Sequence, residues 1–351
     1  MVSSARLTIA LDAMGGDHAP QMVIEGIEIA RTRLPHVDYL LFGDETRLEP
    51  LLEKFPSVRQ VCRICHTAEI VSGESKPSAV LRQGRKTSMW LAVEAVAKGE
   101  AAGVVSAGNT GALMAVSKFV LRMLPGISRP AIAGFFPTAH GETVMLDLGA
   151  NVDCDADNLV DFAVMGDVFA RIVFGIERPS VGILNVGSEE LKGNNAVRGA
   201  AALLRNGTMP IRFHGFVEGN DISSGTVDVV VTDGFSGNIA LKSAEGLAKL
   251  YTAFLREAFS SSWLARVGYL LARPALLKVK MRTDPRRYNG AMFLGLNGIA
   301  VKSHGGTDAV GFANAIGVAV DLITNDFNQR IKNELEKIKS MDLSAAQTVT
   351  V

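Results

Sequence analysis

Polar residues at the ends of apolar, strand-like segments are the part of this sequence best suited to chemistry. The segment 227–232 (VDVVVT) runs into a glycine-rich turn, 233–237 (DGFSG), and then into a helical pattern. Such a turn aims free backbone N–H groups and the positive end of a helix at one point, which suits an anion such as phosphate. Asp233 stands at the end of the strand, where open α/β sheets place their functional side chains.

Other strand-like segments lead into turns of the same kind. They cover 7–12, 103–106, 143–148, 181–186 and 299–302, and glycine, asparagine, aspartate or serine follows each of them. Because the carboxyl ends of parallel strands meet at one edge of a sheet, we expect these turns to line a single cleft. The predicted phosphate- or substrate-binding residues are Asp12, Lys86, Ser106, Gly108, Gly111, Asp147, Asn151, Asn220, Gly234, Ser236, Gly237 and Asn238. In the alternative interpretation, the asparagines and aspartates only satisfy the backbone of their turns.

Strand-like and helix-like segments alternate along most of the chain. This order predicts an α/β fold with a largely parallel sheet and helices on both of its faces. No clear linker divides the chain, so residues 1–340 are interpreted as a single catalytic unit, either one domain or two lobes that share a cleft. Residues 341–351 are expected to form a loose tail.

The segment 247–288 differs from the rest of the chain in charge. Between residues 256 and 287 it has eight basic and two acidic residues, with aromatic and aliphatic residues between them. This pattern predicts a basic, amphipathic helical hairpin inserted in the catalytic unit, which suits a membrane surface or an acidic protein partner. The residues expected to make that contact are Arg256, Trp263, Arg266, Leu270, Arg273 and Lys278. A helix pair packed on the core or in a dimer interface is the alternative.

The composition excludes several classes of protein. The 351 residues have no net charge, 21% are charged and 48% are hydrophobic, which indicates a globular chain without an overall attraction to nucleic acid. We expect no signal peptide, because Asp12 interrupts the first apolar run, and no membrane span, because no stretch of ~18 uncharged apolar residues occurs. Three cysteines fit a reducing cytoplasm.

Common cofactor and metal motifs are missing or incomplete. The chain has no G-x-G-x-x-G after its first strand and no G-x-x-x-x-G-K-[ST], which disfavours nicotinamide and P-loop sites. Asp153, Asp155 and Asp157 resemble the start of a calcium loop, but the required glycine is replaced by Asn158 and the closing glutamate by Val164. These acids are instead expected to cap the helix that follows, and we predict neither a metal nor a cofactor.

The cysteines offer one alternative chemistry. Cys154 would be an acyl-accepting nucleophile if His18, His214 or His304 served as its base, but it does not stand at a strand–helix turn. Cys62 and Cys65 form a C-x-x-C in a strand-like segment, where positions three apart face opposite sides. We therefore interpret that pair as structural.

Long motifs in the sequence match one family. The motifs are IALDAMGGDHAP (9–20), VSAGNTGALMA (105–115), LPGISRPA (124–131), LDLGANVDC (146–154), GNDISSG (219–225) and DVVVTDGFSGNIALK (228–242). With these motifs the chain resembles the PlsX family, the acyl-ACP:phosphate acyltransferases of bacterial phospholipid synthesis, over nearly its whole length and in the family's order. At 82–88, Gln83 and Gly84 interrupt the denser basic run that the resemblance would give.

The resemblance implies transfer of a fatty acyl group from acyl carrier protein to inorganic phosphate. It also implies a homodimer, a fold like that of isocitrate and isopropylmalate dehydrogenases, and a cytoplasmic protein loosely attached to the inner face of the membrane. The partners it implies are acyl carrier protein and the membrane surface, or the membrane-bound glycerol-3-phosphate acyltransferase. Phosphate can attack a thioester directly, so the chemistry requires no enzyme nucleophile.

Roles for single residues are hypotheses at this stage. The amides of 234–238 and 108–111 would cradle the phosphate, with charge from Lys192 or Lys86. Asp233 or His304 would manage the proton on the phosphate or on the leaving thiol. Asn109 or Asn185 would donate to the tetrahedral oxyanion.

Two other classes of function remain open from the sequence. A metal- and nicotinamide-dependent decarboxylating dehydrogenase would follow from the fold relationship, but it requires clustered aspartates and arginines that the sequence does not display. A non-catalytic membrane scaffold of lipid synthesis would explain the basic hairpin, but it leaves the polar turns without a purpose.

Overall fold

The computed structural model describes residues 6–206, 211–282, 284 and 286–348. It contains one eleven-stranded sheet in the order β3-β2-β1-β4-β11-β10-β5-β6-β9-β7-β8. The strands are β1 Leu7–Asp12, β2 Val37–Gly43, β3 Cys62–His66, β4 Gly103–Ser106, β5 Ala131–Pro137, β6 Glu142–Leu146, β7 Ser180–Leu184, β8 Arg212–Val217, β9 Val229–Val231, β10 Ala291–Leu294 and β11 Ile299–Lys302. The helices are α1 Gln21–Arg33, α2 Glu45–Leu52, α3 Pro56–Arg59, α4 Pro77–Gln83, α5 Ser88–Ala97, α6 Thr110–Leu121, α7 Ala156–Phe174, α8 Asn195–Arg205, α9 Gly219–Ser224, α10 Gly234–Ser260, α11 Trp263–Arg282, α12 Ala309–Thr324 and α13 Phe327–Thr348.

The sheet consists of two parallel blocks that run in opposite directions. Strands β3, β2, β1, β4 and β11 form the first block, and β6, β9, β7 and β8 form the second. Between them the pairings β11–β10, β10–β5 and β5–β6 are all antiparallel, so the direction reverses an odd number of times. The prediction that the strands share one carboxyl edge is therefore wrong, because the carboxyl ends of the two blocks lie at opposite edges of the sheet.

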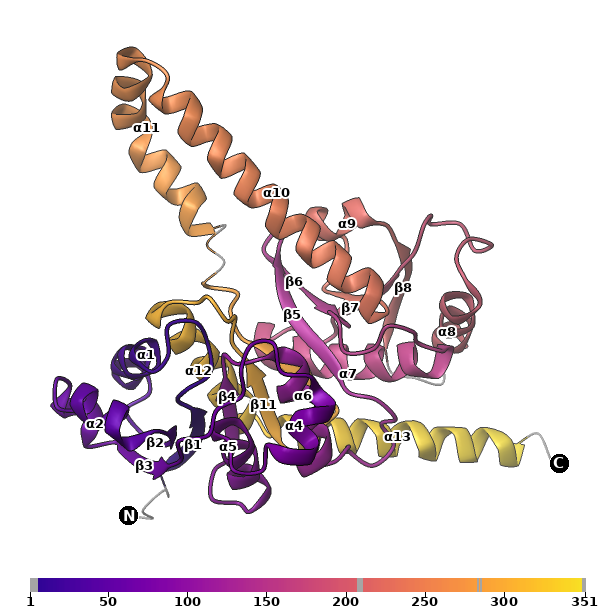
Figure 1. Cartoon of the computed structure of the whole chain (residues 1–351). Coiled ribbons are helices and arrows are strands. Elements are labelled where there is room, and N and C mark those ends of the chain that lie inside the picture. Colours follow the sequence, from indigo (N-terminus) through magenta and orange to yellow (C-terminus); the bar gives the residue numbers. More distant parts are fainter. Residues whose placement is uncertain (1–5, 207–210, 283, 285, 349–351) are drawn as a thin grey trace, which may run out of the picture.

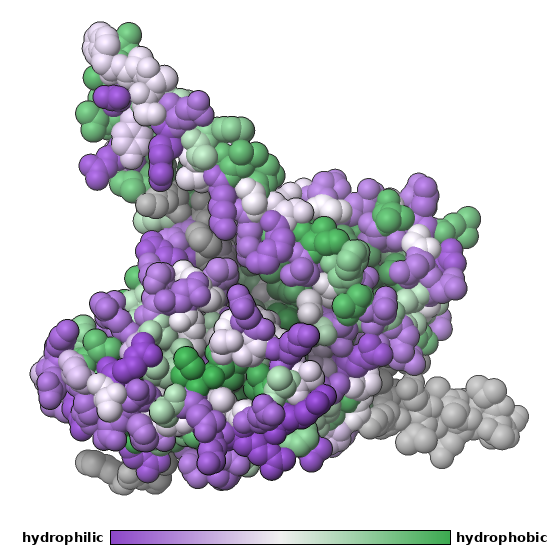
Figure 2. Space-filling model, in the orientation of Figure 1, coloured by the Kyte–Doolittle hydropathy of each residue, from purple (hydrophilic) through white to green (hydrophobic). Residues whose placement is uncertain are grey.

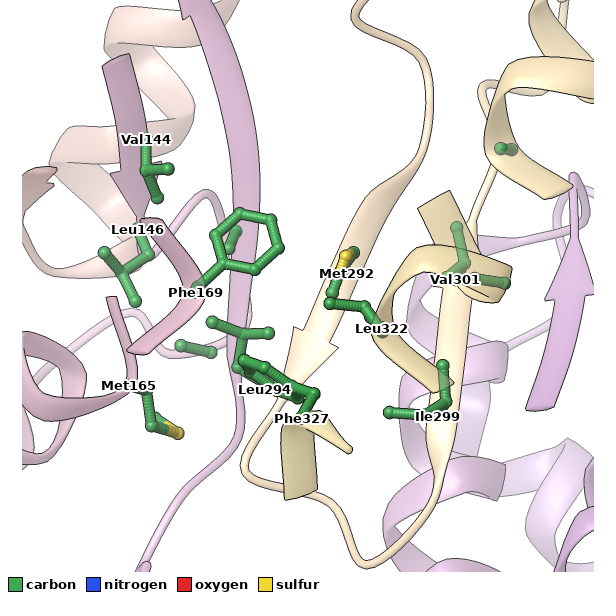
Figure 3. Close-up of a cluster of buried hydrophobic side chains, with 14 of the residues drawn as sticks. Val144, Leu146, Met165, Phe169, Met292, Leu294, Ile299, Val301, Leu322 and Phe327 are labelled. Atoms are coloured by element: carbon green, nitrogen blue, oxygen red, sulfur yellow. The ribbon is translucent and has the colours of Figure 1, made fainter. Parts of the chain in front are cut away.

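Helices cover both faces of this mixed, mostly parallel sheet, which confirms the predicted α/β layering (Figure 1). Successive strand residues alternate between two hydrophobic cores: Ile9 and Leu11 face one, and Ala10 faces the other. Figure 3 shows how one core crosses the block boundary, with side chains from β6 and α7 next to those of β10 and β11. This shared core makes the two blocks one body.

A helical arm leaves the sheet at α10 and returns through α11 (Figure 1). α10 begins at the predicted anion turn and its buried residues are Gly234 and Gly237, at its base. Farther out the arm exposes apolar side chains, among them Tyr251, Trp263 and Leu271, which are 65%, 72% and 80% exposed. The arm corresponds to the predicted hairpin, although positions 283 and 285 of that segment lie outside the described residues.

The C-terminal region is more helical than the sequence suggested. The helical pattern after residue 308 is divided at Asn325 and Asp326, where Asp326 has a φ of 51°. The following helix, α13, continues to Thr348, whereas a loose tail was expected from residue 341. Residues 336–348 (EKIKSMDLSAAQT) include many good helix formers, which accounts for the continuation. None of the helices in the described part of the chain is both long and apolar enough to cross a membrane.

Candidate active site

The carboxyl ends of β1 and β4 meet around a buried carboxylate. Asp12, the last residue of β1, is 1% exposed and accepts hydrogen bonds from the hydroxyls of Ser88 (2.6 Å) and Ser106 (2.7 Å). Burial raises the pKa of Asp12, and these hydrogen bonds oppose the rise. The carboxylate thus fixes the start of α5 and the end of β4 to the end of β1, joining residues 76 and 94 positions away in the chain. We call Asp12, Ser88 and Ser106 the Asp12 cluster.

Glycines allow the backbone to approach this cluster closely. A Cβ atom on Gly15 would lie 2.5 Å from a carboxylate oxygen of Asp12 and 2.7 Å from the amide nitrogen of Gly108. Those contacts are too short for any side chain. The glycine-rich turns that follow β1 and β4 are therefore needed to bring two strand ends together.

A buried lysine lies beside the Asp12 cluster. Lys302 ends β11 and is 8% exposed, and its ammonium donates to the carbonyl oxygens of Ala107 (3.4 Å) and Ser303. Burial lowers the pKa of Lys302 to about 8, although Asp12 and Asp17 favour the charged form. Lys302 was not among the sequence-predicted residues. The available signal was a lysine at the end of an apolar strand, IAVK, directly before a polar turn.

His304 follows two residues later and has a defined hydrogen-bonding role. Its Nδ1 accepts from the amide of Gly306 (3.2 Å), so in the neutral ring Nε2 carries the proton and can donate. Burial lowers the pKa of His304, with Lys302, Lys242 and Lys249 adding to the decrease and Glu245 opposing it. The lowered pKa favours the neutral ring, whose Nε2–H can donate a hydrogen bond.

The His304 turn is held by Asn289, a second residue that the sequence did not indicate. Asn289 is 8% exposed, and its Oδ1 accepts from the amide of His304 (2.8 Å). Its Nδ2 donates to Ser303 Oγ (2.8 Å) and to the carbonyl oxygen of Gly311 (2.7 Å). An asparagine with these bonds fixes the turn between β11 and α12.

Asp147 plays the corresponding part in the second block, with different partners. The residue is fully buried, and its carboxylate accepts from the amides of Ile132 (2.9 Å), Ala150 (3.0 Å) and Asn151 (2.7 Å). The Asn151 side chain donates to it as well, at 2.9 Å, as does the amide of Gly149, at 3.2 Å. Burial raises the pKa of Asp147 against these bonds. Most of its partners belong to its own turn, which the carboxylate organises.

The predicted anion turn packs against that turn. The amide of Gly234 donates to the carbonyl oxygen of Asn151 (2.7 Å), and Asp233 caps α10 by accepting from the amide (2.7 Å) and hydroxyl (3.2 Å) of Ser236. The amide of Gly237 donates to the carbonyl oxygen of Asp233 (3.0 Å). A Cβ atom on Gly149 would lie 3.5 Å from the Cβ of Asn238. Of the amides predicted to hold phosphate here, those of Gly234, Ser236 and Gly237 already have acceptors within the protein.

The two predicted oxyanion donors also hold loops. Asn109 caps α6 by accepting from the amide of Ala112 (2.9 Å), and its Nδ2 donates to the carbonyl oxygen of Gly73 (2.7 Å). Asn185 donates from Nδ2 to the carbonyl oxygen of Lys192 (3.2 Å). The described bonds thus give both amides a structural task.

The other predicted residues are more exposed. Lys86 and Lys192 are exposed, as are Gly111, at the start of α6, and Asn220, in α9. Lys86 and Gly111 belong to the first block, whereas Lys192 and Asn220 follow strands of the second. The predicted set therefore divides between the two blocks.

α10 connects the two blocks. It begins at Asp233 in the second block, and its residues Lys242, Glu245 and Lys249 lie close enough to His304, in the first block, to shift its pKa. Lys242 also lowers the pKa of Lys302, and it pairs with Glu245 at 2.9 Å. Figure 2 shows the surface hollowed at the base of the arm, where α10 leaves the body of the molecule. The site lies between a turn of one block and a helix of the other.

Cys154 lies at the edge of the second block without the properties of a nucleophile. Burial raises the pKa of its thiol to about 12, with Asp147 and Asp233 adding to the rise. The thiol is therefore protonated at neutral pH. The neighbouring Asp155 caps α7 through a reciprocal pair of bonds with Asn158, as the sequence suggested. Cys62 and Cys65 are free thiols in β3, and within the described ranges no three His, Cys, Asp or Glu side chains group as metal ligands.

Sequence comparisons identify similar proteins over almost the whole chain. The family described as "Fatty acid synthesis protein" matches residues 7–330. The phosphate acyltransferase of Paramagnetospirillum magneticum is 71% identical over 344 residues, which cover 98% of either chain. The phosphate acyltransferase of Rhodospirillum centenum is 64% identical over 343 residues, covering 98% of this chain and 97% of the relative.

Two solved structures with a similar fold are phosphotransacetylases. The phosphotransacetylase from Streptococcus pyogenes superposes with a TM-score of 0.59 at 17% identity and covers 92% of this chain and 95% of its own. The EutD phosphotransacetylase from Staphylococcus aureus gives a TM-score of 0.55 at 17% identity and covers 91% and 94%. At such identities the likeness concerns the fold alone.

Proposed function

The chain belongs to the fatty acid synthesis protein family and is a phosphate acyltransferase of fatty acid and phospholipid synthesis, and we propose that it transfers a long-chain acyl group from acyl carrier protein to inorganic phosphate. An oxygen of hydrogen phosphate attacks the thioester carbon and forms a tetrahedral oxyanion. The C–S bond then breaks, the proton of the phosphate passes to the leaving sulfur, and the products are acyl phosphate and the carrier thiol. No redox step occurs.

One observation supports the location of this reaction above all others. His304, from the turn after β11, faces Lys242, Glu245 and Lys249 of α10. The neutral His304 ring offers an Nε2–H donor, and Lys242 and Lys249 of α10 lie near enough to lower its pKa, although Glu245 opposes them. A donor and cations at the base of the arm suit a phosphate dianion and the oxyanion that it forms.

We assign roles from this geometry. His304 Nε2 donates to the phosphate or to the developing oxyanion, and Lys242 supplies positive charge. Lys302 holds the turns after β4 and β11 through the carbonyl oxygens of Ala107 and Ser303, and its charge lies near enough to lower the pKa of His304. Lys192, Lys86 and the amides at the start of α6 remain candidates for additional phosphate contacts.

The arm is proposed to attach the enzyme to the inner face of the membrane. Its exposed tryptophan, tyrosine and leucines would enter the interface, and Arg256, Arg266, Arg273 and Lys278 would meet anionic headgroups. A homodimer that covers part of the same apolar surface would be compatible with this arrangement. Delivery of acyl phosphate to a membrane-bound glycerol-3-phosphate acyltransferase would then need no passage through bulk water.

Turnover of a defined substrate tests the proposal. The purified protein is mixed with a long-chain acyl-acyl carrier protein, and release of the free carrier thiol is followed with and without inorganic phosphate. We expect release only with phosphate, together with an acyl phosphate that hydroxylamine traps.

Other outcomes would contradict the proposal in different ways. Release without phosphate would indicate a thioesterase and would renew the case for Cys154. Binding of the carrier without release would indicate a scaffold. NAD- and metal-dependent oxidation of a hydroxy acid would indicate the dehydrogenase.

A further inference from the structure

An arginine–aromatic surface lies on α5 and α6, away from the arm. Arg85, Trp90, Glu94, Phe119, Val120 and Arg122 line an open recess of about 300 Å³. Arg85 lies over the Trp90 ring at 5.9 Å and Arg122 over the Phe119 ring at 5.7 Å, and the two rings are themselves 5.8 Å apart. Phe119 remains 46% exposed at the centre. We call these six residues the Arg85–Arg122 surface.

The arginines of this surface differ from others on the protein. Arg6, Arg31 and Arg59 pair with carboxylates at 2.9 Å or closer. Among the described residues, Arg85 and Arg122 have aromatic rings as neighbours and no ion pair, so their N–H groups can still bind carboxylates. The acid in the recess, Glu94, pairs with Lys98 at 3.1 Å. Further exposed cations on the same segments are Arg82, Lys86 and Lys118.

The backbone of Arg122 gives an independent indication of function. Its φ of 66° and ψ of 174° belong to a region that glycine adopts and side chains rarely do. The residue is held there because its carbonyl oxygen accepts from the amide of Asn297 (2.9 Å) and because Met123 bridges to Leu296. An exposed arginine at a position that favours glycine costs stability, which indicates that its side chain serves something other than the fold.

The surface is also connected to the reaction site. α5 begins with Ser88, whose hydroxyl donates to the Asp12 carboxylate, and Trp90 follows two residues later. A protein bound over Arg85 and Trp90 therefore covers the first turn of the helix whose start is held by the Asp12 carboxylate. A thioester carried on a flexible prosthetic arm could enter the site from this side.

We propose that the Arg85–Arg122 surface is the docking site for the acyl carrier protein, an acidic protein whose carboxylates meet Arg85 and Arg122 while an apolar side chain covers Phe119. This inference rests on the proposed function. The basic hairpin was expected to contact the carrier protein, the membrane or both. In this proposal the carrier protein binds at α5 and α6, and the arm binds the membrane.

Kinetics with two different acyl donors distinguish carrier docking from catalysis. Rates are measured with acyl-acyl carrier protein and with the same acyl group on pantetheine, which presents the thioester without a protein surface. For the Arg85→Glu/Arg122→Glu double variant we expect KM for the carrier substrate to rise tenfold or more. Its kcat and its kinetics with acyl-pantetheine should stay within twofold. Higher salt should weaken wild-type carrier binding more than that of the variant.

Arg122→Gly is a second variant, with a residue that suits the backbone conformation at this position. Glycine relieves the backbone at this position, so the melting temperature should be unchanged or higher while KM for the carrier rises about threefold. The matched control is Arg256→Glu/Arg266→Glu on the arm, for which carrier kinetics should stay at the wild-type level.

Carrier binding is measured separately by fluorescence anisotropy of a labelled carrier, which needs no turnover. If the wild type lacks phosphate-dependent turnover, the proposed function fails, and anisotropy still decides the docking site. Unchanged carrier binding in the double variant would overturn the docking proposal. Loss of carrier binding in the arm variant alone would also overturn it. A change of oligomeric state in the double variant at constant carrier KM would overturn it as well, because it would indicate that a second copy of the chain occupies this surface.

Discussion

Asp12 and Asp147 are both buried carboxylates at strand ends, yet their surroundings differ. Asp12 binds hydroxyls that come from distant parts of the chain, next to a buried ammonium. Asp147 binds mainly the amides of its own turn. A carboxylate that accepts from its own turn stabilises local structure, whereas one that gathers remote hydroxyls and a cation assembles a site. We infer from this comparison that the Asp12 cluster and Lys302 help to build the first block's part of the site, whereas Asp147 stabilises local structure in the second block.

Removal of the Lys302 charge should have the largest effect on turnover. In Lys302→Met the turns after β4 and β11 lose their shared ammonium, and the reaction space loses a buried positive charge. We expect kcat/KM for phosphate to fall about a hundredfold or more, as for loss of one preorganised electrostatic group. Steady-state kinetics at varied phosphate measure this.

Lys98→Met, at the exposed end of α5, is the matched control and should stay near wild type. A folded Lys302→Met enzyme with wild-type kinetics would show that the first block is not the reaction centre.

Asp147→Ala should affect stability instead. The substitution leaves the amides of Ile132, Ala150 and Asn151 without their acceptor in a buried turn. Unfilled buried donors cost about 1–3 kcal/mol each, and with partial rehydration we expect unfolding free energy to fall by about 3 kcal/mol. Urea denaturation measures it, with Asp147→Asn as the milder comparison. An unchanged midpoint would contradict the structural role.

The pH dependence should have opposite signs for activity and stability. Burial lowers the pKa of Lys302 from 10.5 to about 8 in the folded protein. Between those pH values the lysine therefore binds a proton more strongly in the unfolded chain than in the folded one. Its contribution to stability therefore rises with pH across that window. Turnover should instead decline above pH 8, as the ammonium loses its proton.

Initial rates and thermal melts over pH 7–10.5 test both signs. In Lys302→Arg, whose guanidinium stays charged, the decline in turnover near pH 8 should disappear at whatever absolute rate remains. A decline that persists in this variant would assign it to another group.

The smallest effect is expected at Cys154, in the second block. Its thiol is protonated at neutral pH, because burial raises its pKa to about 12. Cys154→Ser should keep phosphate-dependent turnover close to the wild-type rate. Loss of activity with retained folding would point to a covalent acyl-enzyme, which mass spectrometry of the acylated protein would detect.

Local features of the sequence predicted much of the fold. The strand ending at Asp12 and the helix capped by Asp233 follow from apolar periodicity and turn residues that act within a few positions. The reversal between the two blocks could not be predicted in the same way. The reversal depends on the pairing of β5 with β10 in the region between the two blocks, and β10 comes more than 150 residues after β5.

The candidate site was predicted only in part, for a related reason. Asp12, Ser106 and His304 were recognisable as polar residues at strand ends. Lys302 was not, because a lysine that ends an apolar strand resembles one that extends its ammonium into solvent. The burial of Lys302 depends on turns that follow other strands, and the local sequence around Lys302 does not indicate where those turns lie.

A structure of the protein with inorganic phosphate tests the central claim most directly. We predict that phosphate lies within hydrogen-bonding distance of His304 Nε2 and Lys242 Nζ, between the turn after β11 and α10. Phosphate bound instead at the 233–237 turn, with the bonds of Gly234 and Ser236 opened to receive it, would contradict the account and place the reaction in the second block.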